Sequence, residues 1–205
     1  MKRSSFNAFG QFGVTTGENT PIWCGTPSPV PVGGSLSQNY VKKGLFLPAG
    51  TPVYLADKVA TPVLVYTVKA YASGVSTIDL SEHPGFVPAA GMYASLVGNT
   101  FSTSNGTAIT AVTVNADGTA SVTATVSGAA AGKYIVISVE TKVIPNGYLY
   151  NDVYLGDIDT DLEKAGASCA VIQSHAEGIL IDRTPAAGIA DAMKAAVPCV
   201  IQVKG

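Results

Sequence analysis

The sequence predicts a mainly β protein with one C-terminal α-helix, in which a split β framework carries an inserted small β-barrel or β-sandwich. Short runs of β-branched and aromatic residues recur along the chain, and turn dipeptides rich in Gly, Pro and Asn separate them. Only one stretch, near the C-terminus, has convincing helical periodicity. The length of 205 residues fits one compact unit, or one unit with a smaller insert.

Residues 1–35 are predicted to form an extended N-terminal arm. Glycines separate its phenylalanines and a Pro/Gly-rich stretch follows at 26–34, so a stable helix is disfavoured. The arm carries the aromatic residues Phe6, Phe9, Phe12 and Trp23. Two interpretations stay open: a disordered tail, or an arm that inserts these side chains into a neighbouring subunit, because aromatics are typical interface anchors.

The framework is predicted to comprise residues 36–61 and 143–205. Strand-like runs at 44–47 and 52–55 are joined by a Pro-Ala-Gly-Thr turn, and further strands follow at 148–155, 168–173, 178–182 and 199–203. The helix is expected to start at Thr184 as N-cap, with Pro185 in its first turn, and to end before Pro198. Its apolar stripe is Ile189, Met193 and Val197.

The insert is predicted to be an all-β module over residues 62–142. The expected strands are 63–71, 75–80, 109–114, 119–126 and 134–139, the last one central because it is almost wholly apolar. Asp117-Gly118 supplies the positive-φ positions of a tight turn, so 109–126 is predicted to be a hairpin.

The charge content excludes some classes of partner and favours assembly. Twelve Lys+Arg against 14 Asp+Glu give a net charge of −2, so no basic field can hold nucleic acid or an anionic membrane. No apolar run is long enough to cross a bilayer, and the start lacks a signal-peptide core, so secretion is not expected. Only 13% of residues are charged, roughly one group per 350 Å² of a monomer's surface. Either small uncharged residues carry solubility, or much of this surface is covered by other subunits.

No pattern in the sequence predicts an enzyme. His83 and His175 lie in no nucleophile or metal motif, so structural or surface roles are expected. Glu82 and Glu177 have no partner carboxylate at a glycosidase spacing. We therefore predict no catalytic residues and no cofactor.

No metal site is predicted either. The acidic cluster at 157–161 lacks the Gly and Glu of a calcium-binding EF-hand loop; a solvated loop is favoured, with adventitious or structural Ca²⁺ as the alternative. Cys24, Cys169 and Cys199 are odd in number and far apart, which argues against a disulfide scaffold or a zinc site.

Several segments resemble the head-decoration, or auxiliary capsid, proteins of tailed bacteriophages. The run Gly44-Leu45-Phe46-Leu47-Pro48-Ala49-Gly50-Thr51-Pro52-Val53 is similar to their Leu-Pro-Ala-Gly-Thr-Pro-Val motif. Residues 75–80 followed by His83-Pro84-Gly85-Phe86 resemble a second motif, although Ala90-Gly91-Met92 stands where the family has Val-Gly-Asp. Residues 148–157, 178–185 and the Ala-rich helix ending at Val197-Pro198 also look similar to the family's C-terminal framework.

The resemblance implies a non-enzymatic virion protein that is made in the host bacterial cytoplasm and seated on the capsid surface. Its partner would be the major capsid protein, often with three copies of the chain forming a trimer, and it would stabilise the head. The alternative is an outward-facing head-fibre or adhesion module that binds host-surface glycans. Tyrosines that could stack on sugars are Tyr66, Tyr71, Tyr93, Tyr134, Tyr148, Tyr150 and Tyr154, although strand tyrosines are more often ordinary half-buried residues. For assembly contacts we predict the arm aromatics, or else the framework strands around Phe46 and Tyr54.

Overall fold

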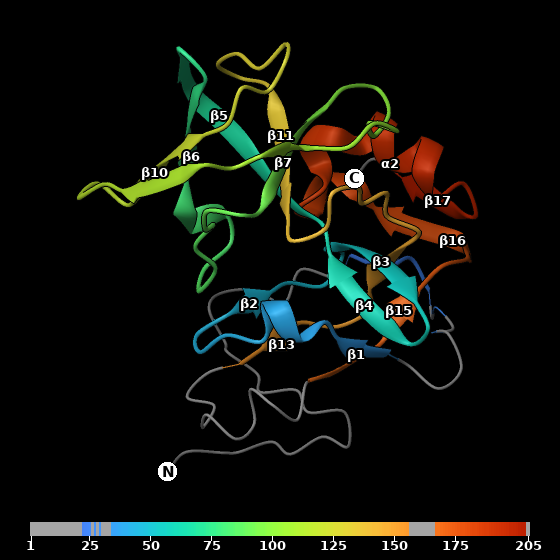
Figure 1. The fold of residues 1–205 in the computed structure, drawn as a ribbon. Helices are drawn as coiled ribbons and strands as arrows, with labels where there is room; N and C mark the ends of the chain where they lie inside the picture. Colours follow the sequence, from blue (N-terminus) through green and yellow to red (C-terminus); the bar gives the residue numbers. More distant parts are fainter. Residues whose placement is uncertain (1–21, 26, 28, 30–33, 156–166, 204–205) are drawn as a thin grey trace.

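The computed structural model describes residues 22–25, 27, 29, 34–155 and 167–203 (Figure 1). Over these residues the protein is mainly β with one short C-terminal helix, which confirms the predicted fold class. Phe6, Phe9 and Phe12 and the acidic cluster at 157–161 lie outside the described residues.

The framework sheet has six strands drawn from both ends of the chain. In spatial order they are β14 (Ser168–Cys169), β1 (Gly34–Leu36), β4 (Val59–Pro62), β3 (Pro52–Ala56), β12 (Gly147–Leu149) and β15 (Val171–Ile172). β1 runs parallel to β4, and the other neighbours are antiparallel. Two small pairs complete the framework: β2 (Phe46–Leu47) with β13 (Val153–Tyr154), and β16 (His175–Leu180) with β17 (Val200–Val203).

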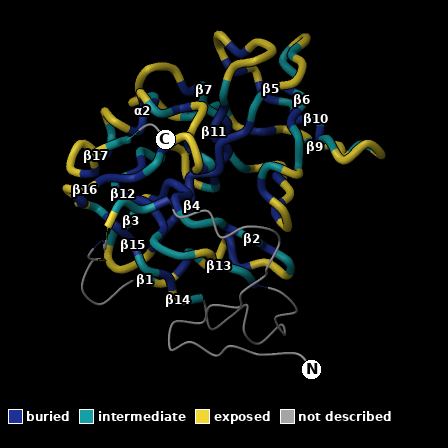
Figure 2. The backbone as a smooth tube through the Cα atoms, turned by 180° about the vertical axis from the view of Figure 1, so that it is seen from behind, coloured by how far each residue is buried: buried dark blue, intermediate teal, exposed yellow. Residues whose placement is uncertain are grey.

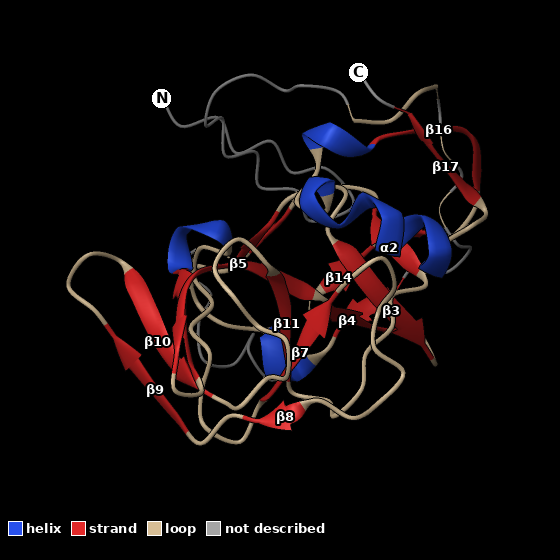
Figure 3. Ribbon diagram, turned by 90° about the horizontal axis from the view of Figure 1, so that it is seen from above, coloured by secondary structure: helices blue, strands red, loops and turns tan. Residues whose placement is uncertain are grey.

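The second sheet takes its seven strands from a single continuous stretch. Their order is β8 (Thr107–Ala108), β7 (Tyr93–Val97), β11 (Tyr134–Ser138), β5 (Leu64–Ala72), β6 (Val75–Asp79), β10 (Thr119–Thr123) and β9 (Ala111–Val114). β11 is an interior strand, as its apolar sequence predicts, and β9 and β10 form the hairpin predicted from Asp-Gly (Figure 3).

This sheet curls into a small barrel because its two edge strands are consecutive in sequence. β8 pairs with β7, and two residues later the same chain pairs with β10 as β9. At the crossing, the Ile109 N–H donates to the Met92 carbonyl at 2.7 Å, and the Thr110 N–H donates to the Thr123 carbonyl at 2.9 Å. One segment thus bridges both edges, and the sheet is barrel-like.

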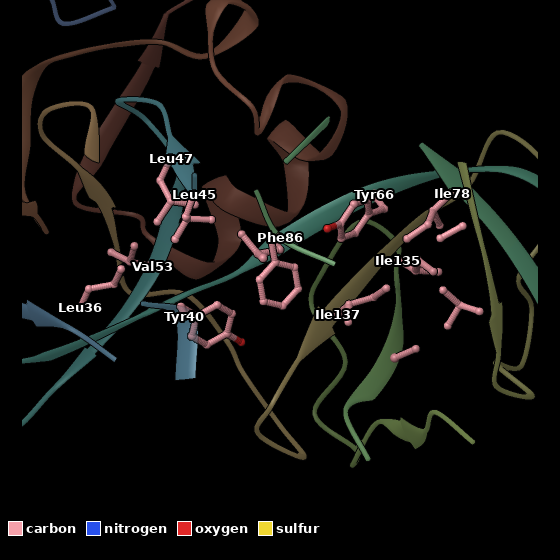
Figure 4. Packing of buried hydrophobic residues seen from close by; sticks show 14 of the residues in the cluster. Leu36, Tyr40, Leu45, Leu47, Val53, Tyr66, Ile78, Phe86, Ile135 and Ile137 are labelled. Atoms are coloured by element: carbon pink, nitrogen blue, oxygen red, sulfur yellow. The ribbon is translucent and has the colours of Figure 1, made fainter. Parts of the chain in front are cut away.

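Strand β5 is apolar on both faces and joins two hydrophobic clusters. Its alternating residues Leu64, Tyr66 and Val68 belong to the cluster that fills the barrel and extends to the framework, whereas Val65 belongs to the other cluster. Side chains from both parts meet in the first cluster (Figure 4). The buried backbone therefore runs continuously from barrel to framework (Figure 2).

The C-terminal helix covers the outer face of the barrel strands, and it starts later than predicted. Ile189, Met193 and Val197 are all buried in the second cluster, as the stripe predicts. However, α2 spans Ala190–Ala196 and follows a 3₁₀ turn, η4 (Ala187–Ile189). The predicted start at Thr184 is therefore wrong.

The late start has a local cause. The Thr184 hydroxyl accepts from the Ala186 N–H at 3.2 Å and donates to the Ile181 carbonyl at 2.8 Å, so it caps a turn after η3 (Ile181–Arg183). A Cβ on Gly188 would overlap the ring of Tyr134. The barrel thus approaches the backbone at the point where a regular helix would have continued.

Candidate functional site

His83 is a buried structural residue at the barrel's inner end. It follows η2 (Leu80–Glu82), is 2% exposed, and its Nε2 lies 2.8 Å from the Val65 carbonyl oxygen. Its ring meets the Tyr66 ring edge-on, with centroids 4.7 Å apart. Burial lowers the pKa of His83 to about 4, so the imidazole is neutral at pH 7. A sealed, neutral imidazole has no access to a substrate.

Glu82, next to His83, is hydrogen-bonded to the backbone of β5. Its carboxylate accepts a hydrogen bond from the Thr67 N–H at 2.8 Å, and burial raises the pKa of Glu82. The buried Tyr66 hydroxyl and His83 Nδ1 have no hydrogen-bond partner in the structure. This end of the barrel therefore holds a cluster of polar groups beside η2, in which Tyr66 and His83 are buried and Glu82 is half-buried.

His175 and Trp23 pack together inside their own chain. The Trp23 indole N–H donates to the Tyr150 carbonyl at 2.9 Å, and its ring lies edge-on to His175 with centroids 5.8 Å apart. His175 Nε2 contacts the Cys24 carbonyl oxygen at 2.7 Å. Trp23 also forms a β-bridge with Ile179 of β16. Its first role is thus to fasten residues 22–24 to the framework, and its role in assembly stays a prediction.

The two framework aromatics predicted for assembly differ in exposure. Phe46 in β2 is half-buried against Tyr154, with ring centroids 6.4 Å apart. Tyr54 in β3 is 42% exposed, beside Val59 at 41% on the hairpin partner β4. Tyr54 and Val59 therefore form an accessible apolar patch on the framework, which nothing in the structure assigns to a partner.

The structure shows what the candidate metal, redox and sugar-stacking residues do. The three cysteines are free, and burial raises the pKa of the Cys169 thiol to about 11. Within the described part of the chain, no group of three or more His, Cys, Asp or Glu side chains is placed to hold a metal ion. Tyr66 and Tyr148 are fully buried and cannot stack on a sugar. Glycan binding stays a prediction for the remaining tyrosines.

An open groove of about 820 Å³ lies between the framework and the barrel. Val41 and Phe86 are buried along it, while Lys42 and Val87 line it as exposed residues. Phe86 stacks on Tyr40 of η1 (Gln38–Tyr40), with ring centroids 5.4 Å apart and planes 18° apart. Sequence reasoning missed this groove, because its two sides are far apart in the sequence.

The strongest surface feature is a stretch of the barrel with almost no charge. Between Glu82 and Lys133 the only Asp, Glu, Lys or Arg is Asp117, at the tip of the β9–β10 hairpin. Exposed residues in this stretch are Gly, Ala, Pro, Ser, Thr, Asn and Val. We call the exposed residues of 83–132 the uncharged face. A count of charges along the sequence could have found it.

Comparison of the chain with protein-family models, with curated proteins and with solved structures finds no match. Among the described residues there is no helix of the length and apolar character needed to span a membrane.

Proposed function

We propose that this protein is an auxiliary, or decoration, protein of a tailed-bacteriophage head, which binds the assembled lattice of the major capsid protein and stabilises it. The observation that carries the proposal is the uncharged face: the 50 residues 83–132, from which its exposed residues come, include one charged side chain. Surface that stays in water is ordinarily rich in charge, whereas the centre of an interface is depleted of it.

The motifs that resemble decoration proteins support the same proposal through their positions. Gly85 of the His-Pro-Gly-Phe motif lies against the backbone of Gly44, at the start of the Leu-Pro-Ala-Gly-Thr motif. The Phe46 N–H also donates to the Pro84 carbonyl at 3.0 Å. The two motifs therefore meet at the joint between framework and barrel.

Stabilisation of a head would follow from mass action. A protein that binds the assembled lattice and not its free subunits shifts the equilibrium toward the assembled state. Many copies on one lattice add their contacts, so each contact can be weak. Catalysis is not part of this proposal.

The test mixes the full chain with heads assembled without it, followed by sedimentation and measurement of the rupture temperature. We expect the chain to sediment with heads in a fixed ratio to the capsid protein and to raise the rupture temperature. Wild-type chain that stays in the supernatant at every concentration contradicts the proposal.

A matched pair of variants locates the contact. Val87→Lys adds a charge to the uncharged face, and Val59→Lys adds one to the framework patch at similar exposure, 50% against 41%. Burying an unpaired charge costs several kcal/mol, so we expect only Val87→Lys to weaken head binding strongly. The reverse result would move the contact to the framework strands near Tyr54.

A further inference from the structure

Strand β9 ends the order of the barrel sheet and leaves one edge unpaired. Among the described strands β9 has a neighbour, β10, on one side only. The chain pairs with β7 as β8, and only afterwards pairs with β10 as β9. The β9–β10 hairpin therefore extends away from the closed part of the barrel (Figure 3). Its turn is exposed (Figure 2).

The orientation of the backbone along β9 follows from one hydrogen bond. The Asn115 N–H donates to the Thr119 carbonyl at 2.9 Å. In an antiparallel pair these bonds come from alternate residues, so the N–H and C=O groups of Thr113 and Ala111 also point toward β10. Val112 and Val114 then direct their N–H and C=O groups away from β10. These groups are a ready template for another strand.

β9 lacks the devices that ordinarily protect a sheet edge. Such edges are shortened, bulged, or guarded by Lys or Pro. Residues 110–114 contain no charge and no proline, and the register with β10 runs without interruption from Val114 opposite Ala120 to Ala111 opposite Thr123. By contrast, β8, at the other edge, has only two residues. Val114 is moreover 56% exposed.

We propose that β9 is a self-pairing edge, through which a second copy of this chain adds its own β9 antiparallel and joins two barrels. The absence of charge is the reason to choose a second copy. In an antiparallel pair of identical strands the residue on the two-fold axis faces its own equivalent, and residues next to it lie near theirs, so a charge there would lie close to a like charge. The β9 strand has none, and Asp117 lies beyond its end.

The geometry fixes the register of the pair. The free N–H and C=O groups belong to Val112 and Val114, so these residues must form the hydrogen-bonded pairs with the second copy. Val112 then lies opposite the second copy's Val114, and Thr113 lies on the two-fold axis. About four N–H···O bonds then link the copies, and the two Thr113 Cα atoms lie about 4.5 Å apart. A contact this small is weak alone and gains strength from repetition on a lattice. It can link trimers as readily as single chains.

This inference goes beyond the proposed function, because it concerns contact between copies and not with the capsid. The test is a disulfide trap in the full chain, with Cys24 and Cys199 replaced by Ser and oxidised glutathione as the oxidant. Thr113→Cys places a thiol on the proposed axis, whereas Thr110→Cys places an equally exposed thiol off it. We expect the Thr113→Cys chain to form a disulfide-linked dimer at least about tenfold faster than the Thr110→Cys chain.

A second substitution tests the backbone pairing. Val112→Pro removes an N–H that β10 does not use, so it should abolish the advantage of Thr113→Cys. Because the Val112 side chain also packs on the barrel core, the matched control is Val112→Ala, which loses the same packing but keeps the N–H and should keep the advantage. If the proline variant fails to fold, Val114→Lys serves the same purpose, with Val87→Lys as its control at similar exposure.

Equal trapping at positions 110 and 113 would overturn the inference, as would an advantage that survives Val112→Pro. Trapping of Thr113→Cys onto the capsid protein, and not onto a second copy, would overturn it too. The proposed function fails separately, when the wild-type chain does not sediment with heads. A dimer that ignores heads keeps the inference and removes the function.

Discussion

The backbone of Gly85 in the barrel lies against the backbone of Gly44 in the framework, with no room for a side chain between them. A Cβ built on Gly85 would overlap the Gly44 carbonyl group and the Leu45 nitrogen. Gly85 also has φ +80°, a conformation that other residues rarely adopt. The joint between barrel and framework therefore requires glycine at this position for two independent reasons.

Gly85→Ala is expected to destabilise the protein by about 3 kcal/mol or more, since left-handed strain adds to backbone overlap. The measurement is the free energy of unfolding in denaturant. Gly132→Ala is the control, because Gly132 has φ +79° but open space around its Cβ position, so it reports the strain alone. Equal losses in the two variants would show that the close approach at Gly85 contributes nothing.

His83 should make stability depend on pH. The folded state holds its pKa near 4, against 6.5 for the free side chain, so between these values the unfolded chain binds more protons. Stability is fully present above pH 6.5 and falls as pH is lowered toward 4. Between pH 7.5 and 4.5 we expect a loss of about 2–3 kcal/mol from this residue.

The control for His83 is His83→Asn, whose side chain does not titrate. Its amide is too short to replace the Nε2 contact with the Val65 carbonyl, so the substitution lowers stability at every pH without adding a pH dependence. The raised pKa of Glu82 acts in the opposite direction, because the folded state then takes up a proton more readily. Comparison of the two proteins removes that contribution. An identical pH dependence in His83→Asn would contradict the assignment.

Local chemistry predicts most strands, but long-range pairing decides how they assemble. Asp117-Gly118 and the alternation around it were sufficient to predict the β9–β10 hairpin. The choice between a barrel and a sandwich stayed open in the sequence, because β8 has two residues and its partner β7 is set only by the folded chain. Likewise, the close approach of Tyr134 to Gly188, just before α2, joins residues that are distant in the sequence.

The candidate surfaces were predictable only in part. The shortage of charge indicated assembly, and its concentration in residues 83–132 can be counted in the sequence. However, the sequence could not show that Trp23 is held by Tyr150 or that Val41 and Phe86 line one groove, because both depend on tertiary contacts. Exposed aromatics and buried aromatics look alike in a sequence.

The β3–β4 turn offers a stabilising substitution. Asp57 and Lys58 both have positive φ, 48° and 65°, in a two-residue hairpin loop. Such loops favour Gly at the second position, because a side chain there costs about 1 kcal/mol. Lys58→Gly is therefore expected to raise the free energy of unfolding by roughly 0.5 kcal/mol after its greater chain entropy is counted. Lys58→Ala should not raise the free energy of unfolding, because alanine keeps the strained positive φ. An increase as large as that of Lys58→Gly would show that relief of strain is not the cause.

Substitutions of Trp23 and Tyr54 distinguish a residue that anchors the fold from a residue that contacts the capsid. Trp23→Ala removes the hydrogen bond to Tyr150 and the packing on His175, so unfolding should become easier by about 2–3 kcal/mol. Tyr54→Ala removes a ring that is 42% exposed and should change stability by less than about 0.5 kcal/mol. The measurements are denaturant unfolding and sedimentation with heads for both variants. A stable Tyr54→Ala chain that no longer sediments would place the capsid contact on the framework, whereas unchanged stability in Trp23→Ala would contradict its role as an anchor.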